Sequence, residues 1–216
     1  MGIFDDCFDD CRCCYNSCKD LWWCILCLTI LFFIILIVIL VAAFGFVRHA
    51  DITVDDASLT HLALNTTTTP TTLAYNLTLA LTIRNLNWAM AMTNTKPLDA
   101  TYSFDGQMFD RVRLAGEGDE HPAGKTRVYR LVSGSGGAAV MLGNAGEVEF
   151  RKENATGVFE VEVMVKGEVK YTARLKKCVI EATCPLKLQL APPGQAAEAV
   201  VFQKVKCKLA KAEKGC

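Results

Sequence analysis

The sequence carries no Asp, Glu, Lys, Arg or His between positions 21 and 47, a stretch of 27 residues. As a helix this stretch would be roughly 40 Å long, against about 30 Å for the hydrocarbon core of a bilayer. A cleaved signal peptide has a shorter apolar region that follows basic residues. Here, the first 20 residues hold five Asp against Arg12 and Lys19. We therefore predict an uncleaved transmembrane helix over residues 21–47.

The chain also has no excess of charge and no common enzyme motif. Its 23 basic and 23 acidic residues cancel, and it is neither basic nor aromatic enough to favour nucleic-acid binding. Its three histidines are scattered, and no zinc-protease, nucleophile-elbow or phosphate-loop motif occurs. The sequence therefore predicts a protein that is not an enzyme, with no cofactor and no metal site.

Two short segments imitate functional motifs. Residues 134–139, GSGGAA, formally fit a dinucleotide fingerprint, but that motif requires a strand, turn and helix in a parallel sheet. Residues 116–124, GEGDEHPAG, are acidic but do not have the spacing of a calcium loop. We expect a flexible loop at the first segment and a solvated hairpin loop at the second.

Three N-x-[ST] sequons, which accept N-linked glycans, all follow the apolar stretch. They begin at Asn65, Asn76 and Asn154. Two basic residues precede the apolar stretch and only Arg48 closely follows it, which weakly favours a cytosolic N-terminus. We predict a single-pass protein with a cytosolic tail over residues 1–20 and a domain over residues 48–216 that is glycosylated and lies outside the cell.

The predicted cytosolic tail is rich in cysteine. A reducing compartment disfavours a stable disulfide knot, and the two Cys-x₃-Cys pairs overlap within twelve residues with no His nearby, which makes a metal site the less favoured alternative. Cysteines beside a membrane are the usual substrates of S-acylation. The residues predicted to be S-acylated are Cys7, Cys11, Cys13, Cys14 and Cys18.

The region after the apolar stretch alternates between apolar and polar residues, as half-buried β-strands do. The odd positions from 73 to 83 are apolar, and Asn76 falls on the solvent face. Asp105-Gly106 predicts a hairpin turn, and Phe159, Val161, Val163 and Val165 predict a second inward-facing row. Seven to nine such strands with intervening turns predict an all-β antiparallel sandwich.

Four details of this sandwich are further expectations. Residues 148–150, VEF, read as a strand, and no convincing amphipathic helix follows the apolar stretch. A phase change across Lys176-Lys177 suggests a β-bulge. The segment RNLNWAMAM predicts a crossover whose Trp caps the sandwich. The alternative is an exposed apolar lip for lipid or a partner, formed by Trp88, Met90 and Met92.

Four cysteines lie on the predicted oxidising side, at positions 178, 184, 207 and 216, and allow three pairings. If CPLKLQL and FQKVKCKL are adjacent antiparallel strands, Cys184 and Cys207 could face each other, and we hypothesise that bridge. The lysines from position 204 onward make the C-terminus basic. We expect a solvated terminus there rather than an anion-binding site.

The order of these parts resembles the plant NDR/HIN-like proteins, named for non-race-specific disease resistance and harpin-induced genes. The resemblance extends from about residue 15 to about residue 210. It rests on the segments ASLTHLAL, NLTLALTIRNLNWAM, LDATYSFDGQMF and CPLKLQL…VFQKVKCKL. The family usually has Asn-Pro-Asn where this chain has Asn85-Leu86-Asn87.

The resemblance implies that residues 48–216 form a group 2 late embryogenesis abundant domain, which is a fibronectin-III-like β-sandwich. It also implies a Cys184–Cys207 disulfide and a plasma-membrane protein of plant defence and stress responses. Such a protein binds a protein partner or cell-wall polysaccharide. The alternative function is a lipid-binding or stress-protective sandwich at the membrane.

Overall fold

The computed structural model describes residues 6–67, 71–140, 142–190 and 202–210. The chain divides between Phe46 and Val47 into a helical unit and a β unit. The helical unit contains α1 (Asp6–Phe44), and its segment Leu21–Phe44 is long and apolar enough to cross a membrane. The predicted apolar helix is therefore confirmed: its apolar segment begins at Leu21 as expected and ends at Phe44, and residues 6–20 before it are also helical.

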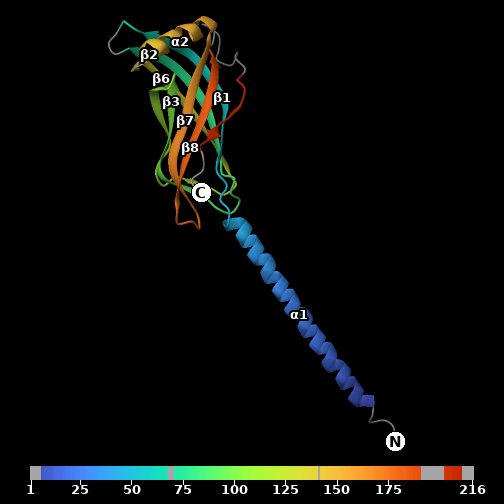
Figure 1. Cartoon of the computed structure of the whole chain (residues 1–216). Helices are drawn as coiled ribbons and strands as arrows, with labels where there is room; N and C mark the ends of the chain where they lie inside the picture. The colour runs from blue at the N-terminus through green and yellow to red at the C-terminus, as the bar shows by residue number, and fades with distance from the viewer. Residues whose placement is uncertain (1–5, 68–70, 141, 191–201, 211–216) are drawn as a thin grey trace. The chain divides into compact units, whose positions relative to one another are not determined.

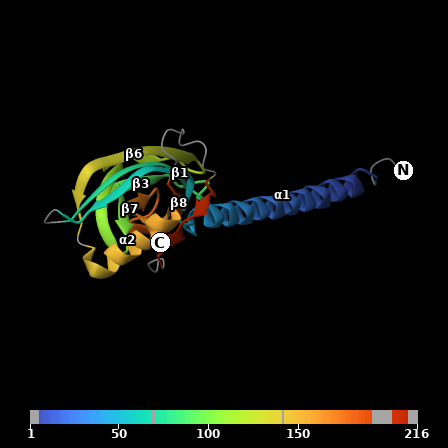
Figure 2. The ribbon, with the colours of Figure 1, turned by 90° about the horizontal axis from the view of Figure 1, so that it is seen from above.

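The β unit is an antiparallel sandwich of two sheets (Figure 1), as predicted. One sheet has the strand order β6-β2-β1-β9 and the other the order β10-β8-β7-β3-β4, with β5 paired to β3. Figure 2 shows β6 and β1 curving over β3, β7 and β8. Among the described residues, the strands are β1 (Asp51–Asn65), β2 (Thr72–Arg84), β3 (Met92–Phe104), β4 (Gln107–Ala115), β5 (Glu120–His121), β6 (Thr126–Ala139), β7 (Val158–Tyr171), β8 (Lys177–Gln189), β9 (Val205–Lys206) and β10 (Lys208–Leu209).

The alternation in the sequence places the core residues as predicted. All six odd positions from Leu73 to Ile83 on β2 are at most 5% exposed, and the inward row of β7 from Phe159 to Val165 is at most 2% exposed. The hairpin between β3 and β4 turns at Asp105 and Gly106, whose φ angles are 46° and 73°. Two positive φ values in succession are those of a tight type I′ turn, which explains the Asp-Gly pair.

A helix that was not predicted covers one end of the sandwich. α2 (Gly143–Thr156) includes residues 148–150, so the expected VEF strand and the expected absence of a helix after residue 47 are both wrong. Its Phe150 ring lies 5.9 Å from Phe104 on β3 and 5.6 Å from Phe159 on β7, measured between ring centroids. This packing against the core stabilises a helix whose own amphipathic signal is weak.

Two other expectations are corrected. Residues 134–139 belong to β6 and pair with β2, so they are not a flexible loop. β7 ends at Tyr171 and β8 begins at Lys177, so the phase change comes from a hairpin turn rather than a bulge. Ala173 in that turn has a φ of 66°, and Leu175 is 95% exposed.

The C-terminal segment connects the two sheets. β9 pairs with β1 in one sheet, and β10 pairs with β8 in the other, antiparallel as hypothesised. Cys207 lies between them, donates its N–H to the Ile52 carbonyl at 3.0 Å, and is joined by a disulfide to Cys184 on β8. Cys178 at the start of β8 is also disulfide-bonded. The disulfide at Cys207 therefore fixes the segment that closes this edge of the sandwich.

Candidate functional site

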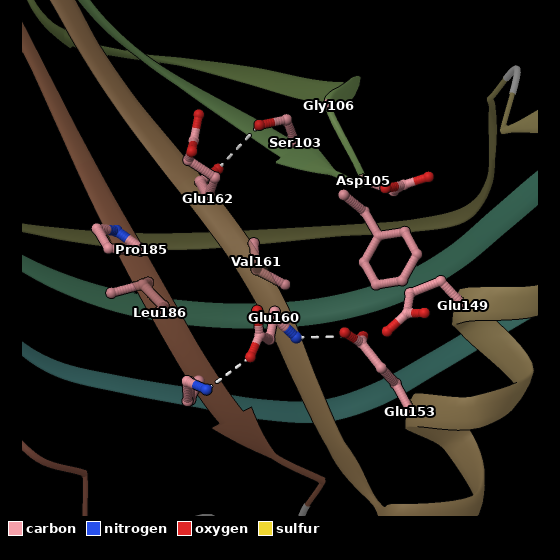
Figure 3. Close-up of a pocket in the computed structure, with 12 residues that line it drawn as sticks. Ser103, Asp105, Gly106, Glu149, Glu153, Glu160, Val161, Glu162, Pro185 and Leu186 are labelled. Carbon is pink, nitrogen blue, oxygen red and sulfur yellow. Dashed lines mark hydrogen bonds and ion pairs between the residues drawn. The ribbon is translucent and has the colours of Figure 1, made fainter. Parts of the chain in front are cut away.

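A pocket of about 430 Å³ opens at the end of the sandwich that α2 covers (Figure 3). The end of β3, the Asp105–Gly106 turn, α2, β7 and β8 contribute its walls. The lining residues are Ser103, Phe104, Asp105, Gly106, Glu149, Glu153, Glu160, Val161, Glu162, Pro185, Leu186 and Lys187. Five of these carry carboxylates and one carries an amine, so the pocket has an excess of negative charge.

The carboxylates come from three different parts of the fold, the turn after β3, α2 and β7. Glu149 and Glu153 project from successive turns of α2, and Figure 3 shows them pointing toward Glu160 on β7. Glu160 Oε1 pairs with Lys187 Nζ at 2.6 Å. Glu149 Oε1 pairs with Lys152 Nζ, outside the pocket lining, at 2.8 Å. The remaining negative charge is what a ligand entering the pocket would meet.

Glu153 is the most enclosed of these carboxylates, with 9% of the residue exposed. Burial raises its pKa above the ordinary value, and the bond it accepts from the Glu160 N–H at 3.2 Å opposes that rise. The neighbouring Glu160 has a lowered pKa because Lys187 donates to it. The two adjacent glutamates are therefore held with different proton affinities by their surroundings.

A second concavity of about 450 Å³ lies on the other side of Lys187. It shares Pro185 and Lys187 with the acidic pocket and is otherwise more apolar. Its other lining residues are Ala57, Val158, Leu188, Gln189, Phe202, Gln203 and Val205. The two concavities give the end of β8 an acidic side and an apolar side, as suits an amphipathic segment.

The chemistry of the acidic pocket favours binding of a cationic group. Among the residues that the structure describes, no group of three or more His, Cys, Asp or Glu side chains has a geometry that could hold a metal ion. The pocket carboxylates instead line a space of about 430 Å³. Lysine and arginine bind carboxylates through charge-assisted hydrogen bonds.

The predicted glycosylation sites are all on the surface. Asn65 ends β1, Asn76 lies on the outer face of β2, and Asn154 lies near the end of α2, and each is exposed. The Asn65 side-chain oxygen accepts the Thr67 N–H at 3.0 Å. These positions are sterically open to a glycan.

The predicted acylation sites lie at the start of α1. Its backbone is helical through this region, but the side chains of these cysteines are outside the part of the chain that the structure describes. The residues concerned are Cys7, Cys11, Cys13, Cys14 and Cys18. Their S-acylation stays a prediction.

The predicted lip does not form as a unit. Trp88 is 61% exposed, whereas Met90 and Met92 are both 0% exposed and belong to the core. The two methionines cannot contact a lipid or partner because β3 begins at Met92 and carries it inward. Of the three residues, only Trp88 is on the surface.

The two asparagines that precede Trp88 lie inside the β unit and hold its loops together. Asn85 and Asn87 are 0% and 3% exposed. Asn85 Nδ2 donates to the carbonyl oxygen of Met90 at 2.8 Å, and Asn87 bonds Arg48. Their burial could not be read from a motif that is equally common in exposed turns.

His121 was expected in a solvated loop, and this expectation is wrong. It lies in β5, is 1% exposed, and its Nε2 is 2.7 Å from the Tyr129 hydroxyl. Burial lowers the pKa of His121, and the nearby Arg127 lowers it further. It is a core residue beside a polar partner.

The C-terminal lysines are partly neutralised. Lys204 Nζ lies 2.6 Å from Asp55, and Lys206 Nζ lies 2.8 Å from Asp51, both on β1. Lys204, Lys206 and Lys208 are exposed, as expected of a solvated terminus, and Lys211 and Lys214 lie outside the residues that the structure describes. The two ion pairs reduce the positive charge that an anionic polymer would meet.

The acidic pocket was missed because α2 was missed. The segment has one large buried apolar residue, Phe150, since the other buried positions of the helix are Gly146 and Glu153. A signal was present in the charge spacing, because Glu147 and Arg151 are four residues apart and pair at 3.5 Å. Gly157 follows the helix with a φ of 69°, a common C-terminal signal.

Comparison with known proteins identifies no family. No protein-family model matches the chain, and no curated protein matches it. A solved structure described as a protein from Archaeoglobus fulgidus is similar over 64% of this chain and 99% of its own, with 10% identity and a TM-score of 0.30. The class that the fold defines is an antiparallel β-sandwich attached to one helix able to span a membrane.

Proposed function

We propose that the protein is a membrane-anchored, non-enzymatic interaction protein of plant defence and stress responses. α1 spans the plasma membrane, residues 1–20 lie in the cytosol, and the sandwich lies outside the cell and binds a partner. The observation that carries this proposal is that one chain combines two parts. Its helix has an exposed apolar segment, Leu21–Phe44, and its separate β unit presents an acidic pocket.

The pocket lies far from the point where the chain enters the sandwich. The entry segment at Arg48 bonds the loop before β3, whereas the pocket includes the last residue of β3, Phe104. The 13 residues of β3 span roughly 40 Å at about 3.3 Å each. The pocket and the entry point therefore lie at opposite ends of β3.

The charge of the pocket favours a protein partner over a polysaccharide. Wall polyanions would be repelled by the excess carboxylates, and Lys204 and Lys206 are already paired with β1. A Lys- or Arg-bearing segment would be attracted, and attraction between exposed charges weakens with salt. We therefore assign the pocket to a cationic protein segment.

The lipid-binding alternative has less support. It required an apolar lip of three residues, and two of them, Met90 and Met92, are wholly buried. The concavities described above are open and line the sandwich surface rather than its interior. We do not assign the sandwich a lipid-carrying role.

Proximity labelling in intact plant cells tests the proposed function. The full chain is compared with a chain truncated to residues 1–50, which lacks the sandwich. It is also compared with the pocket variant Glu149→Lys/Glu162→Lys and with a matched control elsewhere on the sandwich, Glu117→Lys/Glu120→Lys. We expect an extracellular partner to be labelled by the full chain and the control alone. Identical labelling by all four chains would refute binding through the sandwich.

A further inference from the structure

The end of the sandwich where the chain enters carries two exposed apolar side chains. Trp88 precedes β3 and is 61% exposed, and Leu175, in the turn between β7 and β8, is 95% exposed. The two loops are joined, because the Thr172 N–H donates to the Ala91 carbonyl at 2.9 Å. An exposed Trp and an exposed Leu therefore lie at the same end of the β unit.

This face is tied to the segment that follows α1. Asn87 accepts the Arg48 N–H and donates to the Arg48 carbonyl, each at 2.7 Å. The Gly124 N–H in turn donates to the Asn87 carbonyl at 2.8 Å. Trp88 is thus the immediate neighbour of the residue that holds the entering chain.

The length of the connection restricts where this face can lie. Only Gly45, Phe46 and Val47 separate the end of α1 from Arg48. Since an extended chain spans at most about 3.6 Å per residue, Arg48 lies within about 14 Å of Phe44. The 24 residues of Leu21–Phe44 rise about 36 Å against a hydrocarbon core of about 30 Å. In a spanning helix, Phe44 would therefore lie at the membrane boundary and Arg48 within about 14 Å of it.

The charges around the two apolar residues are mixed. Arg48, Lys125 and Lys176 are exposed at this end, and so are Glu117, just before β5, and Glu120, in β5. Such a surface suits a zwitterionic headgroup layer without requiring anionic lipid. Tryptophan is enriched at this depth because its ring is apolar and its N–H is polar.

We propose that Trp88 and Leu175 insert into the interfacial layer of the bilayer that α1 spans, and so hold the sandwich against the membrane surface. The proposal rests on the proposed anchoring. It assigns this face to phospholipid headgroups and the acyl boundary beneath them. The acidic pocket at the opposite end of the sandwich is left facing outward.

Fluorescence quenching of Trp88 tests the insertion. The chain has three tryptophans, so Trp22→Phe/Trp23→Phe leaves Trp88 as the sole emitter. The full chain is reconstituted in phosphatidylcholine vesicles with and without a spin label on the headgroup. The matched control adds Trp88→Phe and Val148→Trp, because Val148 on α2 is also 61% exposed but lies at the other end.

We expect the label to quench Trp88 at least about twofold more than the control tryptophan, because an inserted Trp lies at headgroup depth. Leu175→Ser should reduce this difference by weakening insertion. Equal quenching of the two tryptophans, in a chain that resists alkaline extraction from the vesicles, would overturn the insertion alone. A chain that alkaline buffer removes would overturn the anchoring as well.

Discussion

Asn87 and Arg48 are joined by two hydrogen bonds of 2.7 Å, in which the Asn87 side chain accepts from the Arg48 N–H and donates to its carbonyl. The side-chain amide of Asn87 pairs with both backbone polar groups of Arg48, as a neighbouring β-strand would. Its own N–H donates to Asn85 Oδ1 at 3.0 Å. Two buried asparagines therefore fix the path by which the chain enters the sandwich.

Asn87→Ala should destabilise the sandwich and loosen the entering segment. Leaving the Arg48 backbone groups unpaired costs about 1–3 kcal/mol of unfolding free energy. Urea unfolding of the full chain in detergent measures that loss, and the rate of tryptic cleavage after Arg48 measures the loosening. Asn76→Ala, at an exposed position on β2, is the control and should change neither. Equal cleavage rates in the two variants would show that Asn87 does not hold the segment.

Removing the Cys184–Cys207 disulfide should lower the unfolding free energy by about 3 kcal/mol, because the bridge closes a loop of about 23 residues in the unfolded chain. The two cysteines are 23 positions apart and both are buried. The Cys184→Ala/Cys207→Ala variant is compared with the parent by urea unfolding. If the midpoint and slope are unchanged, the bridge does not stabilise this edge.

The stability of the sandwich should fall in mild acid because of His121. Burial lowers the pKa of His121 in the folded chain below the ordinary value of 6.5. Between the two pKa values the unfolded chain therefore binds a proton at His121 and the folded chain does not. The contribution of neutral His121 to the unfolding free energy is complete above about pH 6.5. It is lost as the pH falls from there through the lowered pKa of the folded chain. Unfolding between pH 7.5 and 5 should show this loss in the parent chain.

The variant His121→Gln isolates that effect. Glutamine can still bond Tyr129 but cannot titrate, so the dependence on pH should flatten. His61→Gln, at an exposed position, should leave the parent curve in place. A curve for His121→Gln that is parallel to the parent over this range would exclude His121 as the group responsible.

Phe150→Ala should detach α2 and reshape the acidic pocket. Phe150 is 7% exposed and packs between Phe104 and Phe159, so truncation should cost about 3 kcal/mol. Val148→Ala, in the same helix but 61% exposed, should cost less than about 0.5 kcal/mol. Hydrogen exchange of the α2 amides should accelerate in the first variant only. Similar exchange in both would mean that Phe150 does not hold the helix.

The sandwich could be predicted from the sequence because strict alternation over β2 and β7 has one physical explanation, a half-buried strand. The Asp105–Gly106 hairpin was predictable for a similar reason, since two positive φ values restrict the residues that fit. The apolar stretch likewise indicated its helix, although not the helical residues before it.

The end of the sandwich bearing the acidic pocket could not be predicted, because α2 has only one large apolar anchor and is held by Phe104 and Phe159 from distant strands. The burial of Met90 and Met92 depended in the same way on where β3 begins. His121 was misplaced because a buried histidine in an acidic segment has no local signature. Each of these errors concerns a residue whose environment is made by tertiary contacts.

A glycosidase mobility shift on the full chain from plant cells tests most directly whether the sandwich lies outside the cell. We expect a shift that is lost in steps with Asn65→Gln, Asn76→Gln and Asn154→Gln. A reporter sequon in the tail, made by Asp5→Asn with Cys7→Thr, should add no shift. A glycan on the tail reporter with none on the three native sequons would contradict the proposed orientation and place the sandwich in the cytosol.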